Sequence, residues 1–211
     1  MAKKESTLKN MLVALLVITA VSGGILGLVY GVTKDAINEV SIKKNAAAIA
    51  EVLGTDENTV LDTVTLDGML YNVARDAEGN FLGAAIKSTS NGFGGKIELM
   101  VGILADGTIK KVSVLSQSET PGLGANMTTP KFKNQFDEKH PDSFNLKVTK
   151  DGGDVDAITA ATISSRAFTL AVKNACDSFK NNIGQFVQQV VEEEAVAEEI
   201  IETTEGGNEN E

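Results

Sequence analysis

A run of hydroxyl and small side chains is the part of the chain best suited to chemistry. It reads Asp156-Ala157-Ile158-Thr159-Ala160-Ala161-Thr162-Ile163-Ser164-Ser165 and directly precedes a long amphipathic segment. The first turn of a helix has unpaired backbone N–H groups and the positive end of the helix dipole, so it favours a phosphate group. Small residues beside the hydroxyls let a bulky ligand approach the backbone. The run predicts either a phosphate-binding helix start or an ordinary Ser/Thr helix cap.

Two glycine-rich segments precede this run. The first is Gly92-Phe93-Gly94-Gly95 and the second is Glu119-Thr120-Pro121-Gly122-Leu123-Gly124. Glycines let a backbone turn sharply or lie against a flat ligand. Each segment alone is also consistent with plain turn chemistry, so neither identifies a ligand by itself.

Taken in this order, the three motifs resemble the RnfG and NqrC families. Their last motif is close to Asp-x-x-(Ser/Thr)-Gly-Ala-Thr-x-(Ser/Thr)-Ser, and in them FMN is joined through its phosphate to the Thr after Gly-Ala. That residue is Thr162 here, and Asp156 is the leading acid. The chain departs from the pattern at Ala160, where the families have Gly. Alanine is costly there if the position needs a positive φ, and acceptable if it needs only a small side chain.

The resemblance implies an FMN site made by the last two motifs. Thr162 would carry the flavin as a phosphoryl threonine, the loop of residues 119–124 would lie beside the ribityl chain or ring, and the Ser164 and Ser165 hydroxyls would hold phosphate oxygens. The expected FMN-binding residues are Glu119, Thr120, Gly122, Leu123, Gly124, Thr159, Ala160, Ala161, Thr162, Ser164 and Ser165.

The composition argues against other kinds of chemistry. One cysteine, Cys176, cannot form an internal disulfide or an iron–sulfur cluster, and it falls at a core-facing position. One histidine, His140, lies in a polar loop and is a poor general base or metal ligand by itself. We expect no catalytic residue and no metal site.

The net charge of −10 belongs to the C-terminal end of the chain. Residues 192–211 hold nine Glu and no Lys or Arg, and the remaining chain has 20 acidic and 19 basic residues. The body of the protein therefore gives no electrostatic reason to bind nucleic acid. We interpret residues 191–211 as an acidic disordered tail.

Residues 11–32 predict a membrane anchor. They form a run of 22 residues without a charge, which as a helix is roughly 33 Å long. A cleaved signal peptide is the rival, but the apolar run continues past its best cleavage site at Ala20-Val21-Ser22. Lysines within residues 1–10 place that end in the cytoplasm, so the rest would lie on the periplasmic side of a bacterial inner membrane. Gly23, Gly27 and Gly31 form a stripe suited to a partner helix.

The rest of the chain predicts an α+β domain, an antiparallel sheet with flanking helices. Residues 33–68 would be a helical connector, with a helix over 34–53 that ends at Gly54. Hairpins are expected around residues 76–80 and around Asp106-Gly107, with a further strand over 144–149. An amphipathic helix follows the hydroxyl run, so the FMN-binding domain would cover 69–190 outside the cytoplasm.

The resemblance implies a subunit of the Rnf complex, which moves electrons between reduced ferredoxin and NAD and couples the flow to Na⁺ or H⁺ movement. The chain would be a non-autonomous electron carrier among other Rnf membrane subunits, with its flavin attached by an ApbE-type flavin transferase. Two alternatives remain: an NqrC-like subunit of a Na⁺-translocating quinone reductase, and a flavin-free anchored scaffold domain.

Overall fold

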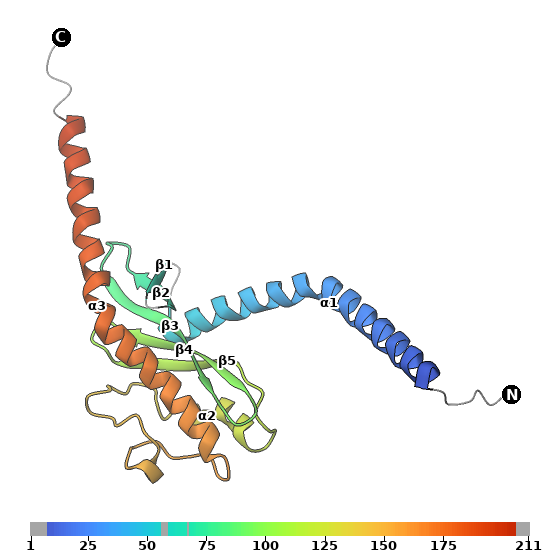
Figure 1. Cartoon of the computed structure of the whole chain (residues 1–211). Coiled ribbons are helices and arrows are strands. Elements are labelled where there is room, and N and C mark those ends of the chain that lie inside the picture. Colours follow the sequence, from blue (N-terminus) through green and yellow to red (C-terminus); the bar gives the residue numbers. More distant parts are fainter. Residues whose placement is uncertain (1–7, 56–58, 67, 206–211) are drawn as a thin grey trace. The chain divides into compact units, whose positions relative to one another are not determined.

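The computed structural model describes residues 8–55, 59–66 and 68–205, with side chains of the last helix described as far as residue 185. The chain divides into two units, residues 1–44 and residues 45–211. Figure 1 shows the elements of both units in chain order.

A single helix, α1 (Leu8–Leu53), forms the N-terminal part of the structure. It includes the charge-free run of residues 11–32 and continues without a break through residues 34–53, where the sequence predicts a separate helix. By length and composition α1 can cross a membrane, and none of its most apolar stretch is buried. The helix ends at Leu53 as predicted, because Gly54 turns the chain with a φ of +59°.

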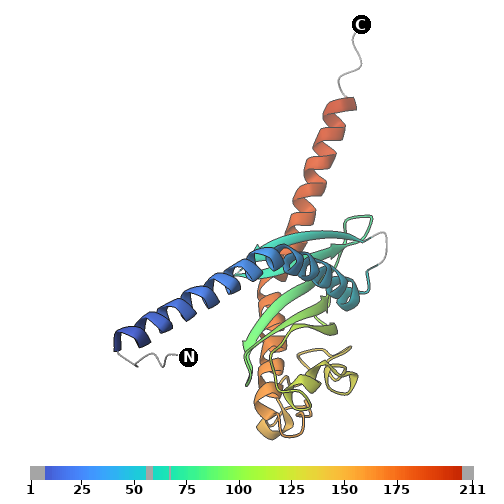
Figure 2. The ribbon, with the colours of Figure 1, turned by 90° about the vertical axis from the view of Figure 1, so that its right-hand side faces the viewer.

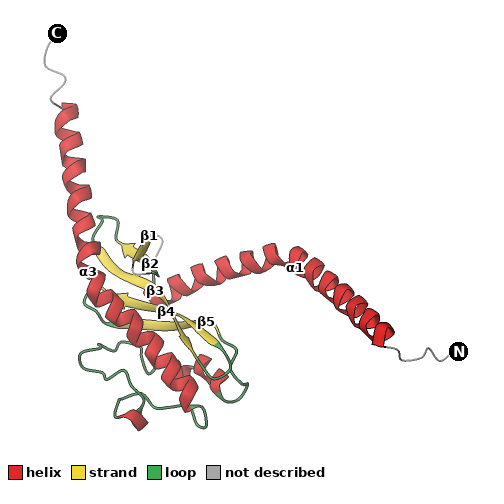
Figure 3. Cartoon of the chain, in the orientation of Figure 1, coloured by secondary structure: helices red, strands yellow, loops and turns green. Residues whose placement is uncertain are grey.

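Five antiparallel strands follow α1 and pair in chain order (Figure 3). The strands are β1 (Val60–Leu66), β2 (Met69–Arg75), β3 (Phe81–Asn91), β4 (Lys96–Leu104) and β5 (Ile109–Ser116). Short helical turns η1 (Gly124–Thr128), α2 (Pro130–Lys133) and η2 (Thr149–Asp151) lie between β5 and the long helix α3 (Thr162–Glu205).

Both predicted hairpins are confirmed. The β2–β3 turn is closed by Asp76, whose Oδ1 accepts the Asn80 N–H at 2.7 Å. The β4–β5 turn places Gly107 at a φ of +89°, and Asp106 Oδ1 accepts the Thr108 N–H at 2.8 Å. The turn residues alone predict both hairpins, because each turn is closed by a hydrogen bond between residues close in sequence.

Two expectations about secondary structure are wrong. The connector of residues 33–68 is helical only to Leu53, because residues 60–66 pair with β2 as an edge strand. The segment 144–149 is not a strand, because it forms no extended ladder: the Lys147 N–H donates to Asn145 O at 2.7 Å within the segment, and the Thr149 N–H donates to Val155 O at 2.8 Å across the same loop. Within this segment, Val148 forms a single bridge, to Val155.

The sheet has two covered faces (Figure 2). Side chains of α3, including Phe168, Val172 and Phe179, pack on one face against the larger core. The last turns of α1, through Ala48 and Val52, pack on the other face. Alternate residues of a strand point to opposite faces, so each strand can contribute to both cores. The fold is the predicted α+β arrangement of an antiparallel sheet between helices.

Two serines of β3 fix α3 to the sheet. Ser88 Oγ donates to Ala171 O at 2.7 Å, and Ser90 Oγ donates to Ala167 O at 2.6 Å. Successive positions on one face of the strand therefore meet successive turns of the helix. These bonds place the start of α3 with respect to β3.

Helix α3 continues to Glu205, so residues 191–205 of the expected disordered tail are helical in the structure. The segment holds Glu, Ala, Val and Ile and lacks Gly and Pro, which suits a helix. Residues 206–211 of the expected tail lie outside the described residues.

Gly102 gives a test of how the end of α1 packs. A Cβ at this position would lie 2.3 Å from Val52 O, a backbone atom that cannot move aside cheaply. We expect Gly102→Ala to lower the free energy of unfolding by about 1–3 kcal/mol, measured by urea denaturation of the full chain in detergent. Gly184→Ala is the control: this helical position has open space, so the substitution should raise stability by about 0.5–1 kcal/mol. Equal effects of the two substitutions would contradict the close packing.

Candidate functional site

A buried carboxyl group joins the three motifs found in the sequence. Glu119 is 6% exposed. Its Oε1 accepts the Gly94 N–H at 2.8 Å, and its Oε2 accepts the Ser164 hydroxyl at 2.5 Å. The β3–β4 loop, the segment after β5 and the first turn of α3 therefore meet at one side chain.

Glycines make room for this carboxyl group. A Cβ on Gly92 would lie 2.2 Å from Glu119 Oε1, and a Cβ on Gly124 would lie 2.5 Å from both Glu119 Oε2 and Ser164 Oγ. The glycines of both loops are thus required for close approach, in addition to any turn that they make.

A cavity of about 400 Å³ lies beside the three joined segments. Its walls include three apolar side chains that are open to solvent: Phe93 is 72% exposed, Leu123 41% and Ile163 53%. The lining residues are Phe93, Glu119, Thr120, Leu123, Gly124, Ala160, Ala161, Thr162, Ile163 and Ser164. Exposed apolar walls around a hollow suit a flat, largely apolar ligand.

The polar end of the cavity is the start of α3. Thr162 is the first residue of the helix, so its own N–H and those of the next two residues have no partner from a preceding helical turn. Lys150 Nζ donates to Thr162 Oγ1 at 3.2 Å. A hydroxyl, several N–H donors and a cation thus gather where a phosphate would fit.

The loop that carries Lys150 is held against α3 by an ion pair. Arg166 donates to both oxygens of Asp151, with Nε–Oδ2 at 2.7 Å and Nη2–Oδ1 at 2.6 Å. The hydrogen bonds from Arg166 hold the pKa of the Asp151 carboxyl below its ordinary value, so this partner stays ionised at neutral pH.

Most of the sequence-predicted FMN-binding residues line this cavity. They are Glu119, Thr120, Leu123, Gly124, Ala160, Ala161, Thr162 and Ser164. Gly122, Thr159 and Ser165 do not line it. The fully buried Ser165 hydroxyl accepts the Ile158 N–H at 2.9 Å and donates to Ala161 O at 3.0 Å, so both of its bonds are made within the segment that begins α3.

The predicted set lacks three residues of the site. Phe93 and Ile163 lie inside the quoted motifs and could have been chosen as the bulky apolar members of otherwise small or polar runs. Lys150 is twelve residues before Thr162, beside the Asp151-Gly152-Gly153 turn, and no spacing rule connects the two. The folded loop is what brings its ammonium group to the hydroxyl.

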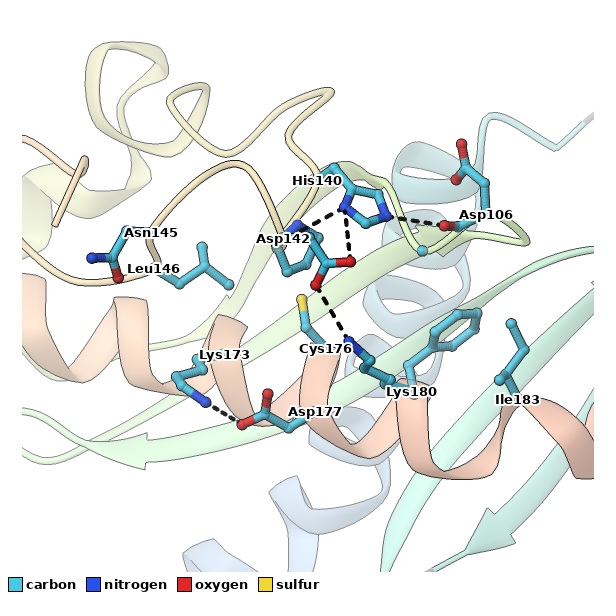
Figure 4. A pocket seen from close by; sticks show the side chains of 13 residues that line it. Asp106, His140, Asp142, Asn145, Leu146, Lys173, Cys176, Asp177, Lys180 and Ile183 are labelled. Atoms are coloured by element: carbon cyan, nitrogen blue, oxygen red, sulfur yellow. Dashed lines mark hydrogen bonds and ion pairs between the residues drawn. The ribbon is translucent and has the colours of Figure 1, made fainter.

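A second cavity, of about 300 Å³, lies further along α3 (Figure 4). His140 Nδ1 accepts the Asp142 N–H at 3.2 Å, so Nε2 carries the proton and donates to Asp106 O at 3.1 Å. Burial raises the pKa of the Cys176 thiol to about 12, which keeps it protonated and unreactive. None of the predicted FMN-binding residues lines this cavity.

Among the described residues there is also no cluster of three His, Cys, Asp or Glu able to hold a metal ion.

The fold and the first cavity define a membrane-anchored domain for a phosphate-bearing, flat cofactor. Residues 92–177 match the FMN-binding domain family, and FMN is the cofactor of this domain. The chain is 38% identical over 181 residues to the G subunit of the ion-translocating oxidoreductase complex of Methanosarcina acetivorans, covering 82% of this chain and 94% of that protein. It belongs to the family of these G subunits, RnfG, as predicted.

A further relative agrees with this assignment, and a solved structure agrees with the fold. The chain is 29% identical over 185 residues to the G subunit of the Na(+)-translocating ferredoxin:NAD(+) oxidoreductase complex of Acetobacterium woodii, covering 79% of this chain and 89% of that protein. The crystal structure of the C subunit of Na(+)-translocating NADH-quinone reductase from Parabacteroides distasonis matches with a TM-score of 0.53 and 18% identity, covering 72% and 96% of the two chains. The match to this crystal structure shows a similar fold. The chain is thus a single-pass membrane protein and one of the subunits of a redox complex.

Ala160 is strained, which decides the question raised by its departure from the family pattern. Its φ is +57°, in the left-handed region that favours glycine. We expect Ala160→Gly to raise the free energy of unfolding by about 0.5–1 kcal/mol, because relief of strain outweighs the added freedom of the unfolded chain. Ala161→Gly, at a position without positive φ, should lower it by a similar amount in the same urea denaturation. A loss of stability in both variants would contradict the strain.

Cys176 gives a pH test of core burial. The pKa of an unperturbed cysteine thiol is 9.0, and burial raises the pKa of Cys176 to about 12 in the folded protein. Above pH 9 the unfolded chain therefore releases a proton that the folded chain keeps. Stability should therefore fall between pH 9 and 12 more steeply in the wild type than in Cys176→Ala, measured by urea denaturation. Parallel pH profiles for the two proteins would show that the thiol is not buried as described.

Proposed function

We propose that this chain is the member of an Rnf complex that relays electrons between ferredoxin and NAD through an FMN attached covalently to Thr162. The observation that carries the proposal is the position of the Thr162 hydroxyl. It belongs to the first residue of α3, which lines the cavity of about 400 Å³, and it is within hydrogen-bonding distance of Lys150. Membership of the G-subunit family supplies the redox context.

The residues present fit FMN at both of its ends. The phosphate would be held by the N–H groups of the first turn of α3 and by the Lys150 ammonium group. The ring would be held against the exposed side chains of Phe93, Leu123 and Ile163, which line the cavity. These three side chains would lose contact with water when a planar ring covers them, which favours binding.

The attachment reaction needs a second protein. A threonine hydroxyl is a poor nucleophile unaided, so an ApbE-type transferase would direct it to the FMN-side phosphorus of FAD. The new Thr162 Oγ–P bond forms as the bond from phosphorus to AMP breaks, AMP leaves, and the hydroxyl proton passes to a base of the transferase.

Asp156 is placed to be recognised by such an enzyme. Its side chain is exposed, while its backbone is fixed by Gln135: the Asp156 N–H donates to Gln135 Oε1 at 2.8 Å, and Gln135 Nε2 donates to Asp156 O at 3.2 Å. A rigid backbone with an exposed carboxylate suits recognition from outside the domain.

Bound FMN supplies reversible one- and two-electron transfer, and the protein holds it. Glu119 fixes the two loops to α3. The apolar walls would exclude water from part of the ring, and the Lys150 ammonium group near Thr162 would balance the phosphate charge. Nothing in this set requires a general acid or base, as expected for a carrier that passes electrons without making or breaking bonds in a substrate.

The membrane arrangement follows from α1. We propose that the domain lies on the periplasmic side, because Lys3, Lys4 and Lys9 precede the apolar run and favour a cytoplasmic N-terminus. Gly23, Gly27 and Gly31 have nothing within 4 Å of a notional Cβ, so this face of α1 is open to close packing with a helix of another Rnf protein.

Intact-mass measurement of the full chain from its native membranes tests the covalent attachment. We expect a mass increase of one FMN less one water in the wild type and none in Thr162→Ala, because the acceptor oxygen is lost. Ser143→Ala, which removes an exposed hydroxyl outside the three motifs and outside the cavity, should retain the addition. An unmodified wild type from membranes with active transferase would overturn the covalent carrier and favour the flavin-free scaffold.

A further inference from the structure

We propose that Lys150 is the phosphate-binding cation of the flavin site, pairing its ammonium group with the non-bridging oxygens of the phosphodiester on Thr162. The inference rests on the proposed function, since it assigns a residue to the covalent flavin site. It concerns a side chain that no motif of the sequence includes.

The distance between the two side chains supports this role. Lys150 Nζ is 3.2 Å from Thr162 Oγ1, the atom that becomes the bridging oxygen of the ester. The phosphorus is bonded to that oxygen, and its non-bridging oxygens are one bond further away. An ammonium group has three donors on a flexible stem, so it can contact such an oxygen without any movement of the backbone.

The loop that carries Lys150 is firmly held. Val148 is buried, and the Thr149 N–H donates to Val155 O at 2.8 Å. A Cβ on Gly153 would lie 2.1 Å from Lys147 O, so the two arms of the loop are in direct contact. The residue after Lys150 is tied to α3 by both bonds of the Asp151–Arg166 ion pair. The side chain of Lys150 therefore starts from a fixed point beside Thr162.

The balance of charge around Thr162 also favours Lys150. Arg166, one turn along α3 from Thr162, is committed to the Asp151 carboxylate. The pair is neutral as a unit and supplies little attraction for an anion. Lys150 adds a full positive charge to the partial positive charge of the helix start, at the place where one negative charge is introduced.

The test compares three variants in the full chain, loaded in detergent with FAD by an ApbE-type transferase. Lys150→Gln removes the charge, Lys150→Arg keeps it, and Lys147→Gln removes a charge from the same loop at an exposed residue three positions earlier. The readouts are the initial rate of flavin incorporation and, on fully loaded protein, the ³¹P chemical shift of the phosphodiester and the rise in melting temperature on loading.

We expect Lys150→Gln to lower the incorporation rate about tenfold, to shift the ³¹P resonance and to reduce the rise in melting temperature. Lys150→Arg should restore all three, and Lys147→Gln should match the wild type. A ³¹P shift and melting-temperature rise in Lys150→Gln equal to those of Lys147→Gln would overturn the inference, even if incorporation is slow, because Lys150 would then act on the transferase alone. A wild type that takes up no flavin would instead overturn the proposed function.

Discussion

The buried carboxyl group of Glu119 is the constraint around which the site is organised. A group of this kind that is almost fully removed from water must find donors within the protein, or folding is penalised. Its donors are Gly94, 25 residues earlier, and Ser164, 45 residues later. Satisfying one side chain thus closes three segments, distant in sequence, around a single cavity. The glycines at positions 92 and 124 are the steric condition for that closure.

The site combines a hydrogen-bonded helix start with apolar side chains that are open to solvent. The hydroxyls of Ser164 and Ser165 both donate to protein atoms, Ser164 to Glu119 and Ser165 to Ala161, so they build the start of α3. The apolar side chains, by contrast, remain open to solvent. Backbone strain in this part of the chain falls on Ala160, two residues before the first residue of α3. Such an arrangement is preorganised at the phosphate end and leaves the ring end to be covered by the ligand.

Sequence patterns predict the parts of the fold that depend on near neighbours. The turns at Asp76 and Asp106 and the glycine after α1 use bonds within a few residues, so the sequence reveals them. The edge strand β1 escapes prediction because its residues are mostly exposed and its pairing with β2 is what defines it. The site shows the same contrast. The sequence motifs predict most residues of the cavity, whereas the Lys150–Thr162 contact depends on how two separate segments meet in the fold.

The serine bonds between β3 and α3 have a consequence for how Thr162, the proposed site of the flavin, can move. Ser88 and Ser90 contact Ala171 and Ala167, so sliding α3 along the sheet would break two hydrogen bonds together. Helix shifts of this kind are a common way for proteins to switch between states. Here such a shift would cost both bonds at once, so movement of the whole domain about α1 is the less costly way to change the distance from Thr162 to a neighbouring protein.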